Sequence, residues 1–178
     1  LRSEYDMLIT KEGEIAINFL GGSTCWNSSL GYYVYRDGQK PASLDQANVV
    51  LVFPNTQDGF KTKTYNGEST KGVFTGSCVK LKYYPNIASD SQEGATYKFP
   101  AGYRIGFVLA TNAWSNRIKN WERNFKVRSA TSSGLSVDRN GKIFDVPRTA
   151  VYKYKDKDTN KDYIMVSFED NTDDNNFS

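Results

Sequence analysis

The segment that decides the fold is Arg104-Ile105-Gly106-Phe107-Val108-Leu109-Ala110. It is among the most hydrophobic stretches of the chain, and it follows a turn at residues 99–103. A short apolar run behind a turn signal is typical of a strand buried in a sheet, so we expect a central strand here. Gly106 lies inside this segment, which indicates a closely approaching neighbouring backbone or a β-bulge.

Further short strands are expected on both sides of this segment. Residues 49–53 form an uninterrupted apolar run, which favours a strand buried on both faces. Residues 79–83 alternate between apolar and polar side chains, as a strand with one buried face does. The other predicted strands are at residues 15–20, 30–35, 60–65, 135–137, 143–144, 150–154 and 163–168. Turn signals such as Gly21-Gly22 and Asp37-Gly38 separate them.

No sustained helical periodicity accompanies these strands. A short helical turn is expected at residues 43–47 with Ser43 as its N-cap. Residues 111–121 fit either a short amphipathic helix or a long aromatic loop. The pattern predicts an all-β fold: a two-sheet antiparallel β-sandwich, jelly-roll-like, with at most one short helix. Because there is no internal repeat or linker, residues 1–178 are expected to form a single domain.

Composition narrows the possible functions. The chain contains no histidine, which excludes Ser-His-Asp and Cys-His catalysis in their usual forms and removes the commonest zinc ligand. The net charge is only +3 and basic residues are interleaved with acidic ones, which argues against nucleic-acid binding. No stretch of about 18 apolar residues is present, so no transmembrane segment is expected. Nothing in the sequence places two carboxylates opposite one another, so we do not expect an enzyme.

Two cysteines, Cys25 and Cys78, lie far apart in the sequence. Their spacing fits neither a metal knuckle nor a redox pair. They form either one disulfide across a long loop or two buried thiols, and a disulfide would indicate an oxidising compartment. Nearby, Asn27-Ser28-Ser29 has the form of a glycosylation acceptor, which is a pattern of low specificity.

The last residues contain a dense group of oxygen ligands directly after the predicted strand at 163–168. The candidate metal ligands are Glu169, Asp170, Asp173, Asp174 and Asn176. Adjacent carboxylates repel one another, and a calcium ion, which takes about six to eight oxygen ligands, would relieve that repulsion. The alternative is a solvated acidic loop or tail.

A second set of oxygen ligands alternates along the chain as Asp156-x-Asp158-x-Asn160-x-Asp162. It resembles the first half of an EF-hand loop. However, Lys161 stands where that loop needs a glycine, and Ser167 stands where it needs the bidentate glutamate. A polar hairpin turn is therefore the better interpretation.

Aromatic side chains form the third candidate site, a platform on which sugar rings could stack. Its members are Trp26, Trp114 and Trp121, with Tyr32, Tyr33, Tyr83 and Tyr84. Trp114 is the strongest of them, since the neighbouring amides, of which Asn112 is one, can hydrogen-bond sugar hydroxyls. The alternative is that most of these rings fill the core or cap its edges.

Two motifs give the sequence a resemblance to a known family. The first is Phe99-Pro100-x-Gly102-x-Arg104-Ile105-Gly106-Phe107, and the second is Phe168-Glu169-Asp170 followed by Asp174-x-Asn176-Phe177. They resemble the "FPxGxxIGF" and closing "FED … DxND" elements of LruC-type and related domains of unknown function, found in exported bacterial proteins, often at the cell surface of Bacteroides-like organisms. The resemblance covers about the last two thirds of the chain. The family pattern continues with a further Asp and an apolar strand, whereas this sequence ends at Ser178.

The resemblance implies an adhesion or calcium-binding role without catalytic activity. We therefore expect a non-catalytic, calcium-binding β-sandwich domain of an exported bacterial cell-surface or adhesion protein, with Ca²⁺ held by the acidic residues after position 168. One alternative is a carbohydrate-binding module that uses exposed Trp and Tyr side chains, and another is a structural or assembly module of a surface fibre. The expected partner is a glycan or a surface protein, and the oligomeric state is left open.

Overall fold

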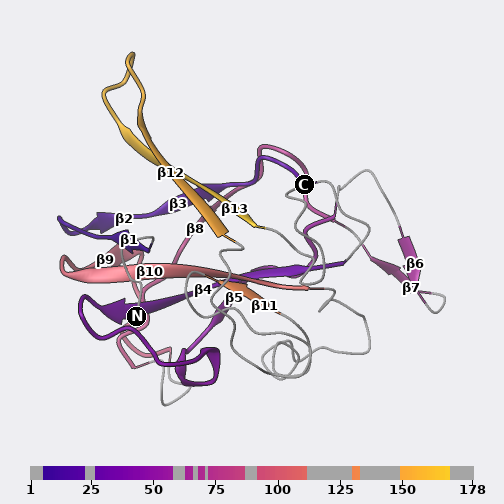
Figure 1. Ribbon diagram of the computed structural model, residues 1–178, viewed down its shortest axis with the longest axis horizontal. Coiled ribbons are helices and arrows are strands. Elements are labelled where there is room, and N and C mark those ends of the chain that lie inside the picture. Colours follow the sequence, from indigo (N-terminus) through magenta and orange to yellow (C-terminus); the bar gives the residue numbers. More distant parts are fainter. Residues whose placement is uncertain are drawn as a thin grey trace.

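A computed structural model of the chain describes residues 6–22, 27–57, 63–65, 68–70, 72–86, 92–111, 130–132 and 149–168. This part of the chain is nearly all β, as predicted (Figure 1). Its strands are β1 (Met7–Leu8), β2 (Gly13–Glu14), β3 (Ala16–Asn18), β4 (Ser29–Arg36), β5 (Val50–Phe53), β6 (Lys63–Tyr65), β7 (Glu68–Thr70), β8 (Cys78–Lys80), β9 (Lys98–Phe99), β10 (Tyr103–Ala110), β11 (Ala130–Ser132), β12 (Thr149–Lys155) and β13 (Asp162–Phe168). The one helical segment within these ranges is the 3-10 helix η1 (Leu44–Gln46).

The main sheet has five antiparallel strands in the order β1-β10-β4-β5, with β11 also paired to β10. β10 is therefore the central strand that its hydrophobic sequence predicts. β4 and β10 pair along their whole length. Because side chains alternate between the faces of a strand, Tyr33 and Tyr35 of β4 point to one face of the sheet, and Tyr32 and Val34 point to the other.

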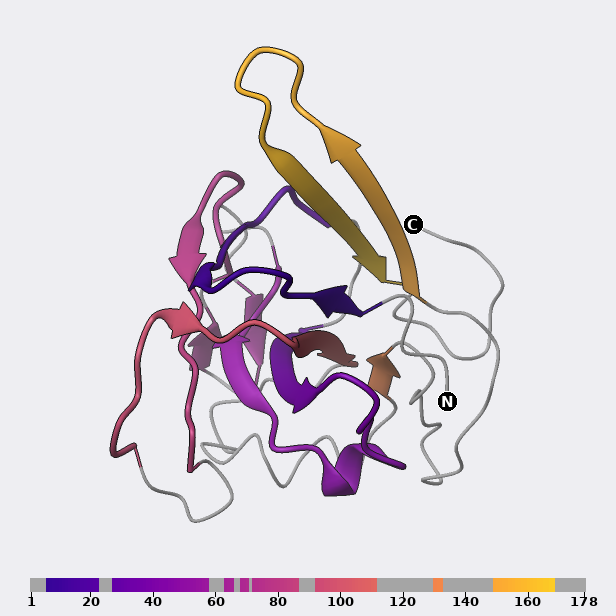
Figure 2. The same cartoon turned by 90° about the vertical axis from the view of Figure 1, so that its left-hand side faces the viewer.

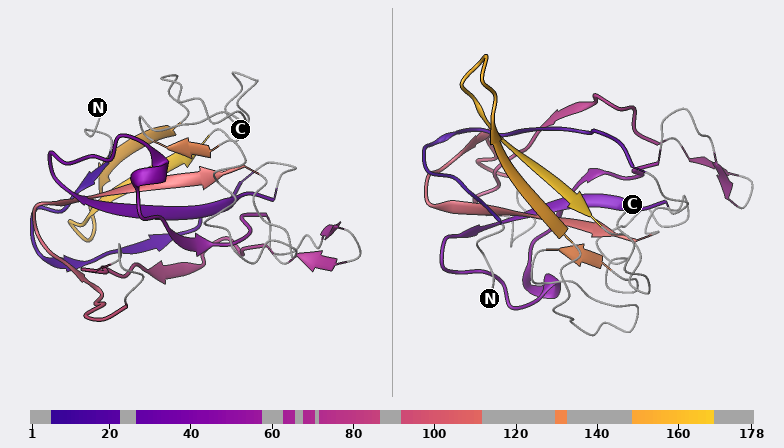
Figure 3. Two further views of the ribbon diagram at one scale, coloured as in Figure 1. Left: turned by 90° about the horizontal axis from the view of Figure 1, so that it is seen from below. Right: turned by 45° about the horizontal axis from the view of Figure 1, so that its top comes forward.

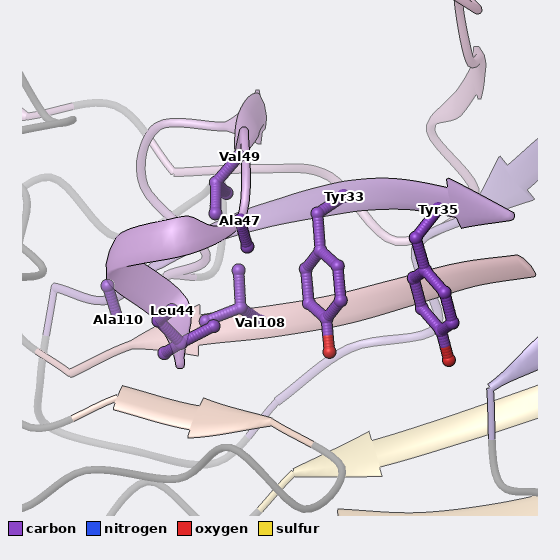
Figure 4. Close-up of a cluster of buried hydrophobic side chains, with 7 residues drawn as sticks. All are labelled: Tyr33, Tyr35, Leu44, Ala47, Val49, Val108 and Ala110. Carbon is purple, nitrogen blue, oxygen red and sulfur yellow. The ribbon is translucent and has the colours of Figure 1, made fainter. Parts of the chain in front are cut away.

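One face of the main sheet is covered by the segment between β4 and β5. This segment contains η1, and its side chains complete a buried cluster of Tyr33, Tyr35, Leu44, Ala47, Val49, Val108 and Ala110 (Figure 4). Tyr33 and Tyr35 stack there with ring centroids 6.0 Å apart. For Tyr33, one of the rings that could either bind a sugar or fill the core, the structure shows the second alternative, because the fully buried ring points into this core.

Gly106 makes room for the ring of Tyr33. The two residues lie opposite each other in the β4–β10 register, which runs through them without a bulge. A Cβ atom at Gly106 would lie 2.3 Å from Tyr33 Cζ and 2.6 Å from its hydroxyl oxygen. The sequence predicted a close approach at this glycine, but the group that approaches is a side chain and not a neighbouring backbone.

The opposite face packs against two short strand pairs, β2–β9 and β3–β8. Side chains such as Ile17, Leu81 and Phe99 meet Tyr32 and Ile105 of the main sheet in a second apolar cluster. Figures 1 and 2 show β2 and β3 on one side of β4 and β10, and η1 on the other. The arrangement is layered and sandwich-like, and the jelly-roll connectivity stays a prediction.

Several predicted elements need correction in detail. The predicted strand at 15–20 is shorter than expected, because β3 covers only Ala16–Asn18, where it pairs with β8, and a separate strand, β2, precedes it and pairs with β9. The side chains of Val50, Leu51 and Val52 in β5 are only half-buried, since β5 is the last strand in the described order of the main sheet. Ser43 precedes η1 as predicted, but its side chain makes no capping hydrogen bond. The predictions for residues 112–121, 135–137 and 143–144 lie outside the described residues.

The N-terminal strand is fixed to the main sheet by a buried ion pair that the sequence analysis did not predict. Lys40 Nζ donates to Asp6 Oδ2 at 2.7 Å, and the two side chains are 3% and 2% exposed. The hydroxyl of Tyr35 donates to the same oxygen, and Arg104 Nη1 donates to the Asp6 carbonyl oxygen at 3.0 Å. Burial raises the pKa of the Asp6 carboxyl, and the hydrogen bonds from Lys40 and Tyr35 offset that rise only in part.

β12 and β13 form the hairpin predicted at the end of the chain, and it extends away from the other described strands (Figure 3). Its loop is a polar turn in which Asp156 Oδ1 accepts a hydrogen bond from the Asp158 backbone N–H at 2.9 Å. That bond is the main reason why the pKa of Asp156 lies below its usual value. Asn160 adopts the left-handed conformation, with φ 57°. The interpretation of this segment as a hairpin turn is confirmed.

Candidate functional site

An open pocket lies where the β4–β5 side of the main sheet meets the segment that follows β8. We call it the tyrosine pocket, and it is lined by Tyr32, Val34, Asn48, Val50, Lys82, Tyr83, Tyr84, Pro85 and Tyr103. Its volume is about 160 Å³. Sites that enclose drug-sized ligands measure about 300–1,000 Å³. The tyrosine pocket is therefore suited to one ring-sized group at a time, with the rest of a longer ligand outside it.

The alternation of side chains along β4 determines which residues form the floor of the pocket. Tyr32 and Val34 leave β4 on the face that carries the second apolar cluster, and Val50 of β5 lies opposite Tyr32 in the register. The far wall comes from residues 82–85, where Tyr83 is held by a backbone bridge to Thr96, with N–O distances of 2.7 Å and 3.0 Å. The pocket thus has strands β4 and β5 on one side and, on the other, a segment fixed by an isolated β-bridge.

Tyr32 joins the two walls. Its hydroxyl donates to the carbonyl oxygen of Lys82 at 2.7 Å and accepts from the backbone N–H of Lys82 at 3.1 Å. The residue is 2% exposed, and this burial raises the pKa of its phenol to about 12. Because both of these hydrogen bonds are made to the protein, Tyr32 fixes the shape of the pocket. Hydrogen bonds to a ligand would come from the residues around Tyr32.

Tyr83 and Tyr103 form a polar corner beside this floor. Their rings meet edge to face with centroids 5.5 Å apart, and their hydroxyls are hydrogen-bonded. Arg36 Nη2 donates to the Tyr103 hydroxyl at 3.2 Å, and its guanidinium carbon lies 5.4 Å from the centre of that ring. The bonds from Tyr83 and Arg36 lower the pKa of Tyr103, whereas burial raises the pKa of Tyr83 to about 12.

The lining of the tyrosine pocket combines apolar ring faces with polar groups. Half-buried faces of Tyr83, Tyr84 and Tyr103 offer apolar contact area, and such rings bind the flat apolar side of a ligand while their hydroxyls stay polar. The exposed amide of Asn48 and the ammonium group of Lys82 add hydrogen-bond donors. The lining contains no carboxylate and no cysteine, and its titratable groups are the tyrosine phenols and the ammonium group of Lys82.

The structure brings together only part of the predicted aromatic platform. Tyr32, Tyr83 and Tyr84 do meet in the tyrosine pocket, whereas Tyr33 lies in the core. The predicted ligand-binding residues outside the described part of the chain are Trp26, Asn112, Trp114 and Trp121. Tyr103, Asn48 and Lys82 also line the pocket, and none of them was predicted from the sequence. Tyr103 could have been found, because it lies two residues before Ile105 in the same strand and so shares its face.

The predicted metal ligands also fall outside the described residues. These are Glu169, Asp170, Asp173, Asp174 and Asn176, so calcium binding stays a prediction. Among the residues that are described, no three acidic or cysteine side chains gather as a metal site would require. Cys78 is a free and exposed thiol, which corrects both predicted alternatives for it, and Asn27 of the possible glycosylation acceptor is buried. Cys25 is not described.

Comparison with known proteins finds no matching family model, curated protein or solved structure. In the described part of the chain, no helix has the length and apolar character needed to cross a membrane. The fold and the site therefore define the class on their own: an all-β, sandwich-like domain with a small tyrosine-lined pocket.

Proposed function

We propose that this chain is a non-catalytic binding domain of an exported bacterial surface protein, and that its tyrosine pocket binds a carbohydrate. The observation that supports this function best is the meeting of three half-buried tyrosines, Tyr83, Tyr84 and Tyr103, around a space suited to one ring. One face of a sugar ring is a patch of C–H groups that stacks on an aromatic ring, and its rim of hydroxyls needs donors and acceptors nearby.

The polar groups of the pocket match that second requirement. Asn48 offers both an amide donor and a carbonyl acceptor, and Lys82 offers a donor at the opposite wall. The rigid hydrogen bonds of Tyr32 and the Tyr83–Thr96 bridge keep the rings in place before a ligand arrives. Such preorganisation lowers the entropy cost of binding, which allows a small contact area to give measurable affinity.

A glycan array followed by isothermal titration calorimetry tests the proposal. Tyr84→Ala is the informative variant, because Tyr84 is half-buried at the pocket and is absent from both core clusters. We expect at least about tenfold weaker binding, since an aromatic anchor of a binding site contributes about 1.4 kcal/mol or more. The matched control is Tyr152→Ala, which removes a 56% exposed tyrosine from the β12–β13 hairpin. No glycan bound at high protein concentration, or equal affinity of Tyr84→Ala and wild type, would refute this function.

A further inference from the structure

The charge on the lining of the tyrosine pocket is positive. Lys82 is the single lining residue that is charged at neutral pH, and none of the lining residues is acidic. Its ammonium nitrogen lies 5.5 Å from the centre of the Tyr97 ring, a distance at which a cation is attracted to the aromatic face. Lys82 therefore brings one positive charge to the lining, and its contact with Tyr97 lies outside the lining.

A second cation, Arg36, lies outside the lining and contacts Tyr103. The guanidinium group of Arg36 reaches the Tyr103 hydroxyl, which brings positive charge to the corner where Tyr103 lines the pocket. The neighbouring acid, Asp37, does not cancel this charge, because it pairs with Arg104 at 2.6 Å. A group that enters the pocket thus meets one cation of the lining, Lys82, and no carboxylate of the lining.

We propose that the tyrosine pocket selects an acidic sugar, a uronic acid residue whose carboxylate pairs with Lys82, the one charged residue of the lining, while Arg36 adds positive charge beside Tyr103. This inference rests on the proposed carbohydrate function and adds the class of sugar. A carboxylate accepts hydrogen bonds from both an ammonium and a guanidinium group, and such charge-assisted bonds are about twice as strong as neutral ones. A neutral sugar can use the same tyrosine rings but gains nothing from the two cations.

The test uses two matched pairs of oligosaccharides. The members of the first pair are built from glucose and from glucuronate, and those of the second pair from galactose and from galacturonate. Calorimetry on the whole chain is expected to give about tenfold tighter binding of the uronate member of at least one pair. Lys82→Gln should abolish that difference, and Lys82→Arg, which keeps the charge, should retain most of it. Raising the salt from about 0.15 M to about 1 M should weaken uronate binding and leave neutral binding unchanged.

Lys153→Gln controls for the net charge of the chain, because Lys153 lies on the exposed β12–β13 hairpin. Equal loss of uronate binding in Lys153→Gln and Lys82→Gln would show unspecific attraction and overturn the inference. Neutral sugars that bind as tightly as uronates, or a Lys82→Gln variant that keeps its preference, would overturn the inference alone and leave the carbohydrate function standing. No binding of either member of any pair would overturn both.

Discussion

Replacing Gly106 by alanine is expected to destabilise the fold, although the same change stabilises many strands. The added Cβ would lie 2.3 Å from Tyr33 Cζ, 2.6 Å from its hydroxyl oxygen and 2.7 Å from Cε2. These three atoms belong to a ring with no exposed surface, which stacks on Tyr35 and is enclosed by the side chains of the η1 segment. The ring cannot turn away into solvent, so the core must shift.

The size of the effect follows from two opposing terms. Overpacking a core costs about 1–3 kcal/mol, and the close approach of three ring atoms places Gly106→Ala toward the upper end of that range. Alanine also restricts the unfolded chain more than glycine does, which returns about 0.4–1 kcal/mol. The net loss should be about 2 kcal/mol, which for a chain of this length lowers Tm by about 4–8 °C.

Urea unfolding of four proteins measures this effect: wild type, Gly106→Ala, Tyr33→Leu and the double variant. Leucine lacks the ring atoms that the new Cβ would meet, so the cost of Gly106→Ala should fall by about 1 kcal/mol or more in the Tyr33→Leu background. Gly13→Ala serves as the control, because the nearest atom to its added Cβ is 3.8 Å away. A Gly106→Ala protein as stable as wild type, or one with the same loss in both backgrounds, would refute the reasoning.

Three further predictions concern ionisable groups. Burial raises the phenol pKa of Tyr32 to about 12, so the stability that its protonated hydroxyl contributes is complete below about pH 10. This stability is lost as the pH rises through about 12, at about 1.4 kcal/mol per pH unit. Urea unfolding of Tyr32→Phe should show a smaller loss of stability with pH than the wild type, and equal losses in the two proteins would contradict this. Lys40→Met leaves the buried carboxylate of Asp6 without its cation, so the free energy of unfolding should fall by about 3–5 kcal/mol near pH 7. Burial raises the pKa of this carboxyl, so the loss should become smaller as the pH is lowered and Asp6 takes up its proton, and a loss independent of pH would count against this explanation. If the acidic residues after position 168 bind calcium, Tm should be several degrees higher in added calcium than in a chelator. This difference should disappear when Asp174 and Asn176 are replaced by Ala. Identical melting curves of the wild type in calcium and in chelator would argue against the site.

The strands could be predicted from the sequence because their signals are local. The apolar runs of β4, β5 and β10 and the alternation around Val79 and Leu81 each depend on neighbouring residues only. The β12–β13 hairpin was predictable for the same reason, since turn residues separate two alternating runs. The segment between these two runs lacks the glycine and the glutamate of an EF-hand loop, and this absence correctly indicated a turn.

Contacts between distant residues could not be predicted in this way. Asp6 and Lys40 are 34 residues apart, and no pattern in either neighbourhood marks them as partners until β1 pairs with β10. Gly106 gave a clear signal of close approach, but the identity of the approaching group, Tyr33, depends on the β4–β10 register. Tyr83 and Tyr84 were correctly grouped with Tyr32 on composition, yet Tyr103 joins them only through that same register.

The tyrosine-rich strand β4 links the stability of the domain to its proposed site. Alternation sends Tyr33 and Tyr35 into one core and Tyr32 to the pocket floor, so a single strand supplies both the packing and the binding wall. Tyr32 uses its hydroxyl to connect the walls, and its loss would therefore alter folding and binding together. Tyr84 is absent from both core clusters, so its loss removes no side chain from either of them. This difference is what allows a binding experiment on Tyr84 to be interpreted as a measurement of recognition and not of stability.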